Sequence, residues 1–181
     1  MKKLTFSALV IICFSVTLSA QVFNTSGTLK KGTFSAGFEP GVYVDPSDFN
    51  LFLHGGAGLT SNIDLGVKLG VLGDETYFGG DVEFGVGKIF SLSAGAHSYF
   101  DFGLDFTGLF TFPIGGVADL YTGLDVDVAF AENDTYFPIW IPIGLEIPLK
   151  KDILFLFEAE INVNDEYYGR HWFGGGLNFI F

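Results

Sequence analysis

Hydrophobic and polar residues alternate along most of this chain with a period of two. In the segment DLGVKLGVLG, Leu65, Val67, Leu69 and Val71 share one face, while Lys68 and two glycines occupy the other. This period is typical of a β-strand whose two faces meet different surroundings. The same alternation runs through DLYTGLDVDVAF and FPIWIPIGLEIPL. The chain is therefore predicted to be all-β.

The alternation predicts ten strands joined by short connections that are rich in turn-forming residues. The strands are expected near residues 31–44, 50–60, 63–73, 76–87, 90–100, 102–112, 117–131, 136–149, 152–163 and 169–181. The break between Tyr99 and Gly103 is the least distinct, and without it the count falls to eight or nine. Pro138, Pro142 and Pro148 all lie in the strand at 136–149, and each removes a ladder hydrogen bond, so a bulge or break is predicted there.

Charged side chains avoid the apolar face of every predicted strand. They lie in connections, where Asp64 is placed, or on the opposite face, which is also rich in glycine. A lipid-exposed face accounts for this, because a charge at the middle of a bilayer costs roughly 2–4 kcal/mol. The charged residues predicted to face the interior are Glu39, Lys68, Asp81, Glu83, Asp105, Asp119, Asp125, Asp127, Glu146, Glu158, Glu160 and Arg170.

A sheet that crosses a membrane must satisfy its backbone hydrogen bonds internally, which requires closure. We therefore predict a closed antiparallel up-and-down transmembrane β-barrel over residues 31–181, with ten strands and eight as the alternative. A soluble lipocalin-like carrier, with the apolar face inward, stays open, because sequence alone does not show which face is concave. Aromatic residues near the strand ends predict two belts at the membrane–water boundaries. One belt comprises Tyr99, Phe100, Phe102, Phe130, Tyr136, Phe137, Tyr167, Tyr168 and Trp172, and the other Phe90, Phe110, Phe112, Phe179 and Phe181.

Residues 1–20 have the layout of a secretory signal peptide. Lys2 and Lys3 precede an apolar segment at 4–16, and Leu-Ser-Ala stands before Gln21. A short periplasmic segment is expected at 21–30. Cys13, the only cysteine, lies inside the signal, so the mature chain would hold no thiol and no disulfide. After the signal, no run of about 18 apolar residues is long enough for a spanning helix.

Removing residues 1–20 takes away two basic residues and no acidic ones. The mature chain then has 7 basic and 21 acidic residues, a net charge of about −14. Such an acidic chain repels the phosphate backbone of nucleic acid, so that class of partner is excluded.

The last eight residues, GGGLNFIF, resemble the C-terminal assembly signal of bacterial outer-membrane barrels. That signal has a glycine, two further residues, an aromatic, one residue and a terminal aromatic, and Gly176, Phe179 and Phe181 match these places. Gly174 stands where the family has a polar residue. The mature chain resembles small outer-membrane β-barrels of the opacity/porin-like kind. The resemblance implies a Gram-negative-type envelope, contact with outer-membrane lipids and lipopolysaccharide, insertion by the barrel assembly machinery, and periplasmic termini.

The predicted interior holds ten carboxylates, two bases, His54 and His97. Hairpin symmetry predicts that Lys68 lies near Asp81 and Arg170 near Glu160. Two like charges at 4 Å repel by about 4 kcal/mol at an effective dielectric of 20, so water or bound cations are expected among the other carboxylates. This predicts a narrow acidic lumen that favours cations. A non-conducting structural or surface-interaction barrel is the alternative, because about eight strands leave room only for side chains.

No catalytic residue, cofactor or metal site is predicted. His97 directly precedes Ser98, so the two residues fall on opposite faces of one strand. The segment GVGK at 85–88 lacks the spacing of a phosphate-binding loop. The sequence therefore predicts a protein that is not an enzyme.

Overall fold

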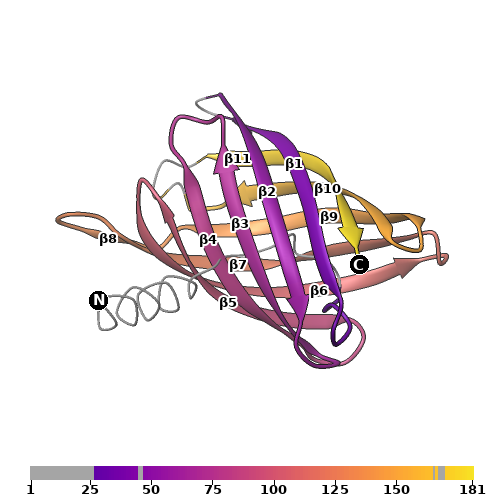
Figure 1. Cartoon of the computed structure of the whole chain (residues 1–181). Coiled ribbons are helices and arrows are strands. Elements are labelled where there is room, and N and C mark those ends of the chain that lie inside the picture. The colour runs from indigo at the N-terminus through magenta and orange to yellow at the C-terminus, as the bar shows by residue number, and fades with distance from the viewer. Residues whose placement is uncertain (1–26, 45–46, 165, 167–169) are drawn as a thin grey trace, which may run out of the picture.

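The computed structural model describes residues 27–44, 47–164, 166 and 170–181. Ten long antiparallel strands and one two-residue strand form a closed barrel with short connections (Figure 1). Within these ranges, no helix is long and apolar enough to cross a membrane. The predicted signal peptide, with Cys13, lies outside the described residues.

Each strand pairs with its neighbour in sequence, and the pairing of the first and last strands closes the sheet. This arrangement confirms the predicted up-and-down barrel of ten strands. The strands are β1 (Phe34–Val44), β2 (Asp48–Gly58), β3 (Ile63–Val71), β4 (Tyr77–Gly85), β5 (Phe90–Tyr99), β6 (Asp101–Ile114), β7 (Ala118–Phe130), β8 (Thr135–Tyr136), β9 (Ile139–Lys150), β10 (Ile153–Asn162) and β11 (His171–Ile180).

The indistinct break near Tyr99 is a real turn. Tyr99 pairs with Asp101, so Phe100 alone connects β5 and β6. Phe100 has a φ of 59°, a left-handed conformation that residues other than glycine seldom adopt. The count of ten strands is therefore correct, and eight is excluded.

The predicted break at the prolines is also confirmed. β8 and β9 share one register against β7, so they form a single strand that is interrupted at Pro138. The β7–β9 ladder is interrupted again where Pro142 stands opposite Gly123. Proline has no N–H to donate, and in a closed barrel both sides of a strand need donors.

The barrel is apolar outside and polar inside. Leu69 and Ile143 are 37% and 46% exposed on the outer face, whereas Asp125 is 9% exposed on the inner face. A soluble lipocalin-like barrel has the opposite polarity, so that alternative is excluded. The buried polar residues on strands include Ser35, Glu39, Asn50, His54, Asp64, Asp81, Glu83, Ser91, Asp105, Thr107, Thr111, Asp125, Glu158, Asn162 and Asn178. Asp64, predicted in a connection, lies in β3 because that strand begins at Ile63.

Exposed aromatic rings occur at both ends of the barrel. Phe102 stacks on Phe130 at 6.0 Å at one end, and Phe90 contacts Phe110 at 4.8 Å at the other. Trp172 was wrongly assigned to a belt, since it is 1% exposed and occupies an inner-face position. Tyr99 likewise lines the interior, as described below. Trp172 and Tyr99 both occupy the alternate positions of their strands whose side chains point into the barrel. Tyr167 and Tyr168 lie outside the described residues.

The described residues before β1 lie against the end of the barrel where β1 begins and β11 ends, which we call the terminal end. The backbone N–H of Leu29 donates to Asp64 Oδ2 at 2.5 Å, and Gly32 N–H donates to Gly58 O at 2.8 Å. Residues 27–30 therefore lie against the barrel rather than extending away as a free segment. Phe34 and Phe181 exchange backbone hydrogen bonds where β1 meets the C-terminus.

The three residues of the predicted assembly signal lie on or directly after β11. A side chain at Gly176 would collide with the backbone of Phe38, so the close approach of β1 and β11 requires glycine here. Phe179 pairs with Ala36 and Ile153 on the two neighbouring strands, and Phe181 is 74% exposed.

Candidate functional site

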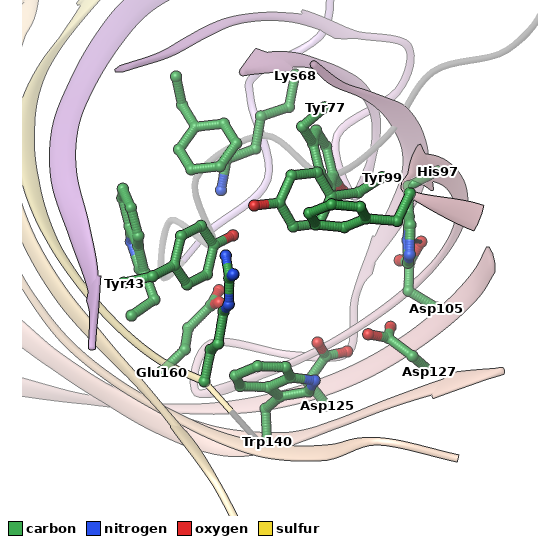
Figure 2. A pocket seen from close by; sticks show the side chains of 14 residues that line it. Tyr43, Lys68, Tyr77, His97, Tyr99, Asp105, Asp125, Asp127, Trp140 and Glu160 are labelled. Atoms are coloured by element: carbon green, nitrogen blue, oxygen red, sulfur yellow. Dashed lines mark ion pairs between the residues drawn. The ribbon is translucent and has the colours of Figure 1, made fainter. Parts of the chain in front are cut away.

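A cavity of about 90 Å³ lies inside the barrel (Figure 2), toward the end that carries the turn at Phe100. We call it the chamber. Every strand except β8 contributes to its wall, because inner-face residues from around the barrel converge on it. The lining residues are Tyr43, Phe52, Lys68, Tyr77, His97, Tyr99, Phe100, Asp105, Asp125, Asp127, Trp140, Glu160, Arg170 and Trp172.

One side of the chamber is a continuous aromatic wall. Trp172 contacts both Tyr43 and Phe52, with ring centroids 4.9 and 5.0 Å apart. Phe52 meets Tyr77 edge-on at 5.4 Å, and Tyr77 is followed by Tyr99 at 6.0 Å. These separations are those of favourable aromatic pairs. The wall is therefore a set of mutually supporting rings.

His97 extends this wall and links it to the first carboxylate. Its ring stacks on Tyr77 with centroids 5.5 Å apart, and its Nδ1 lies 3.6 Å from Asp105 Oδ2. A side chain at Gly103 would occupy the space of the imidazole, so this glycine on β6 gives His97 its room. The imidazole is thereby held between a phenol ring and a carboxylate.

The facing side of the chamber is acidic. Asp125 and Asp127 project from β7, and Glu160 from β10 (Figure 2). Thr107 Oγ1 donates a hydrogen bond of 2.6 Å to Asp125 Oδ1. Trp140, the only aromatic residue from β9 in the lining, lies beside these carboxylates.

The two basic residues of the chamber do not form the ion pairs that hairpin symmetry predicted. Lys68 Nζ lies 3.9 Å from Glu39 Oε2, because the register places Lys68 opposite Gly79 and Asp81 opposite Gly66. Arg170 lies just before β11, and its Nη2 is 3.7 Å from Asp74 Oδ2 in the β3–β4 connection. The predicted partners of both residues lie on adjacent strands of a hairpin, whereas the observed Glu39 lies on β1, two strands away from Lys68, and Asp74 lies in a connection.

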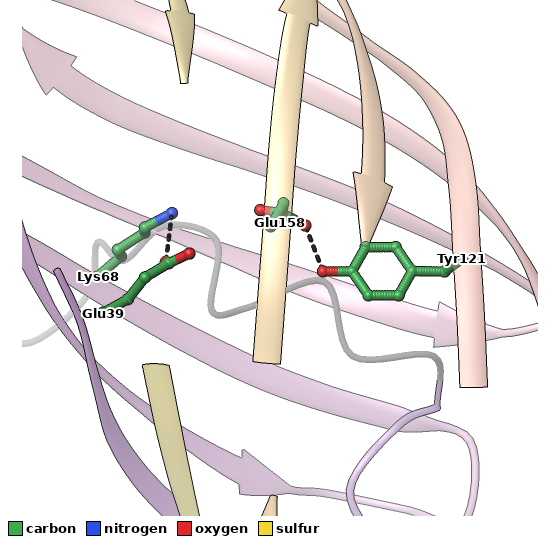
Figure 3. A network of polar contacts seen from close by, with 4 residues as sticks. All are labelled: Glu39, Lys68, Tyr121 and Glu158. Carbon is green, nitrogen blue, oxygen red and sulfur yellow. Dashed lines mark hydrogen bonds and ion pairs between the residues drawn. The ribbon is translucent and has the colours of Figure 1, made fainter. Parts of the chain in front are cut away.

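Two further polar contacts lie inside the barrel, and each joins two strands that are separated by a single strand (Figure 3). Tyr121 O–H donates to Glu158 Oε2 at 2.5 Å, and both residues are almost completely buried. The Lys68–Glu39 ion pair lies in the same region. We call these four residues the mid-barrel layer. They narrow the interior between its two ends.

The remaining predicted interior charges lie at or below this level. Asp81 and Glu83 are buried on β4, and Asp119 lies directly opposite Glu146 between β7 and β9. A second cavity of about 760 Å³ at the terminal end is lined by both of these last acids and by residues 27–30. Among the described residues, no three His, Asp or Glu side chains are grouped so as to hold a metal ion.

Sequence analysis missed the aromatic half of the chamber and the His97–Asp105 contact. The sequence contained part of the signal for the aromatic wall. Its residues are separated by an even number of positions from inward-facing polar residues of the same chain segments, so their side chains point inward too; they are Tyr43, Tyr77, Tyr99 and Trp172. The one-residue turn at Phe100 fixes the register that brings His97 diagonal to Asp105, and that turn was the least certain in the sequence.

No protein-family model matches the sequence, and no curated protein does. Among solved structures, an outer-membrane channel from Pseudomonas putida F1 superposes with a TM-score of 0.51 at 9% identity, covering 89% of this chain and 100% of that one. This chain has the fold of an outer-membrane β-barrel. The outer membrane protein OprG from Pseudomonas aeruginosa gives a TM-score of 0.43 at 14% identity, covering 86% of this chain and 98% of that one. Such low identities concern the fold alone.

Proposed function

We propose that this protein is an integral barrel of the bacterial outer membrane whose interior forms a narrow path for small cations. The observation that carries the proposal is the segregation of charge. Carboxylates fill the inner face of the barrel, while large apolar side chains cover its outer face.

The outer face supports the membrane assignment. Leu124, Phe106 and Phe157 are about half exposed at the middle of their strands, where water would meet them if the protein were soluble. Contiguous apolar surface of this kind normally contacts lipid or a partner. A closed barrel also satisfies its backbone hydrogen bonds in lipid, and an export signal at residues 1–20 fits the same location.

The interior charge supports a preference for cations. Ten carboxylates are predicted to face the interior, and Asp64 is buried there as well. The lysine and arginine residues that line the chamber are Lys68 and Arg170. Rings of Asp and Glu side chains select cations in pores. Because the chamber measures only about 90 Å³, the path would admit small ions rather than bulky solutes.

Planar-bilayer recording tests this function. We expect small single-channel steps whose reversal potential, in a gradient of potassium chloride, moves toward the value for potassium. The double variant Asp125→Asn/Asp127→Asn should reduce that preference, whereas Asp134→Asn, in the β7–β8 connection, should not. An anion preference would contradict the proposal.

Two observations favour a second function, that of a non-conducting barrel that binds ligand at its outer end. The side chains of the mid-barrel layer occupy the interior, and residues 27–30 line the cavity at the terminal end. Heat-dependent migration on a gel shows whether the wild-type protein is folded. If the folded protein gives no conductance steps, the path is closed, and the second function replaces the conducting one.

A further inference from the structure

We propose that the chamber binds a small organic ammonium ion, with its charged head between the aromatic wall and the carboxylates of β6 and β7. This inference rests on the proposed function, because it assumes a membrane barrel with the chamber in its interior. It adds the class of ligand that the chamber binds. It holds whether or not ions pass the mid-barrel layer.

The aromatic wall offers ring faces to positive charge, and the protein's own cations already use them. Lys68 Nζ lies 4.3 Å from the centroid of the Phe52 ring, and the Arg170 guanidinium carbon lies 5.9 Å from that of Tyr43. Cages of Tyr, Trp and Phe recognise ammonium ligands through the same attraction. The wall is therefore suited to an alkylated ammonium, whose methyl groups pack on rings while its charge is attracted by them.

The charge balance of the chamber leaves a place for such a cation. Four carboxylates line the cavity, from Asp105, Asp125, Asp127 and Glu160. The ion-pair partners seen for Lys68 and Arg170, by contrast, are Glu39 and Asp74, which lie outside the lining. The chamber is therefore formally negative before a ligand enters.

The buried carboxylate of Asp105 gives independent support for a cationic ligand. It is 2% exposed and lines the cavity, and neither of its carboxylate oxygens accepts a hydrogen bond from the described residues. Its nearest charged group is the imidazole of His97, at 3.6 Å. Buried carboxylates are normally paired or hydrogen-bonded, because leaving one without a donor is costly. A cationic N–H or ammonium head in the chamber would meet this requirement.

The size of the chamber limits what can enter. A volume of about 90 Å³ equals that of roughly three water molecules in the liquid. This suits the head of an alkylammonium ion. Anions are disfavoured by the carboxylates. A tightly held metal ion is also disfavoured, because no three His, Asp or Glu side chains of the described residues are grouped closely enough to hold one.

Tryptophan fluorescence can report binding directly, because both tryptophans of the chain, Trp140 and Trp172, line the chamber. Refolded barrel in detergent is titrated with choline chloride, with sodium chloride at the same ionic strength, and with the neutral isostere of choline in which carbon replaces nitrogen. We expect a saturable change with choline alone. Equal responses to choline and its isostere would overturn the proposal, as would the absence of any saturable change.

A matched pair of variants on β7 tests the site. Asp127→Asn removes a carboxylate of the chamber, whereas Asp119→Asn makes the same change on the same inner face at the terminal end. We expect Asp127→Asn to weaken choline binding by about fivefold or more, because one lost charge at close range has at least this effect even in water. Asp119→Asn should leave choline binding unchanged. Equal effects of the two would overturn the assignment.

Folding and conductance are measured separately. Migration on an unheated gel shows whether each variant is folded, and Tyr77→Leu, which removes a ring without changing charge, is the second variant if Asp127→Asn does not fold. It should also weaken choline binding, and unchanged binding by a folded Tyr77→Leu barrel would overturn the proposal. A barrel that conducts cations without binding choline refutes this inference alone. A barrel that binds choline without conducting refutes the conducting path alone.

Discussion

Replacing Leu124 with arginine tests whether the outer face of the barrel contacts hydrocarbon. Leu124 is 51% exposed and stands at the centre of β7, six residues from Ala118 and six from Phe130. A strand rises about 3.4 Å per residue, and a tilt of about 40° reduces this to about 2.6 Å along the barrel axis. Each end of β7 therefore lies about 15 Å from Leu124. Since the apolar band is about 25 Å tall, Leu124 lies near its middle.

The two possible surroundings predict different energies. Arginine at the middle of a bilayer lowers the free energy of unfolding by roughly 2–4 kcal/mol, whereas near the interface the effect is about 0–1 kcal/mol. On a water-exposed surface the same change would stay within about 0.5 kcal/mol. We therefore expect Leu124→Arg to destabilise the barrel by about 3 kcal/mol. Val117→Arg, in the exposed turn before β7, should cost less than about 1 kcal/mol.

The measurement is reversible unfolding in urea of protein inserted in phospholipid vesicles, followed by tryptophan fluorescence. Neither substitution touches a tryptophan, so the signal is the same in all three proteins. Equal stabilities of Leu124→Arg and Val117→Arg, each within about 0.5 kcal/mol of the wild type, would show that this face does not lie in lipid. The membrane assignment would then be wrong, whatever the conductance.

Two further predictions concern the interior and the wall. Tyr121→Phe should lower the free energy of unfolding by about 1–3 kcal/mol, because the buried Glu158 loses its phenol donor. Tyr77→Phe, which removes a hydroxyl from the aromatic wall and keeps the ring, should change it less, and equal effects in urea unfolding would contradict the bond. Backbone amides at 136–142, where the ladder to β7 is interrupted, should exchange hydrogen faster than those at 143–150, and uniform protection of the two peptides in mass spectrometry would contradict the break.

The architecture could be predicted because a membrane barrel repeats one rule along its whole length. Each strand alternates, no charge interrupts the apolar face, and the connections are short, so strand number and topology followed directly. Even the interruption at Pro138 and Pro142 could be expected from the missing N–H groups. Asp64 was misplaced because its role depends on Leu29, which is distant in sequence and contributes only a backbone N–H.

The chamber was harder to predict because its geometry depends on register around the whole barrel. Parity shows that Lys68 points inward, but not that it reaches Glu39 on β1, with β2 lying between their strands. Trp172 appeared to be an interfacial anchor, since tryptophan is common there. In the structure it fills the space left by Gly41 on β1, where a side chain would collide with its ring. The sequence contains both residues, but only the pairing of β1 with β11 across the closing seam shows that one accommodates the other.

Conduction and binding place different demands on the mid-barrel layer. A path for ions needs Tyr121 and Glu158 to separate, or to leave room beside them, whereas a binding chamber is best closed below so that its ligand stays between rings and carboxylates. The hydrogen bond between these residues therefore separates the two functions. If Tyr121→Phe raises the conductance without changing choline binding, the bond limits the flow of ions. If both stay unchanged in a folded barrel, the Tyr121–Glu158 bond does not limit the flow of ions, and residues 27–30, which line the terminal cavity, are the next position to vary.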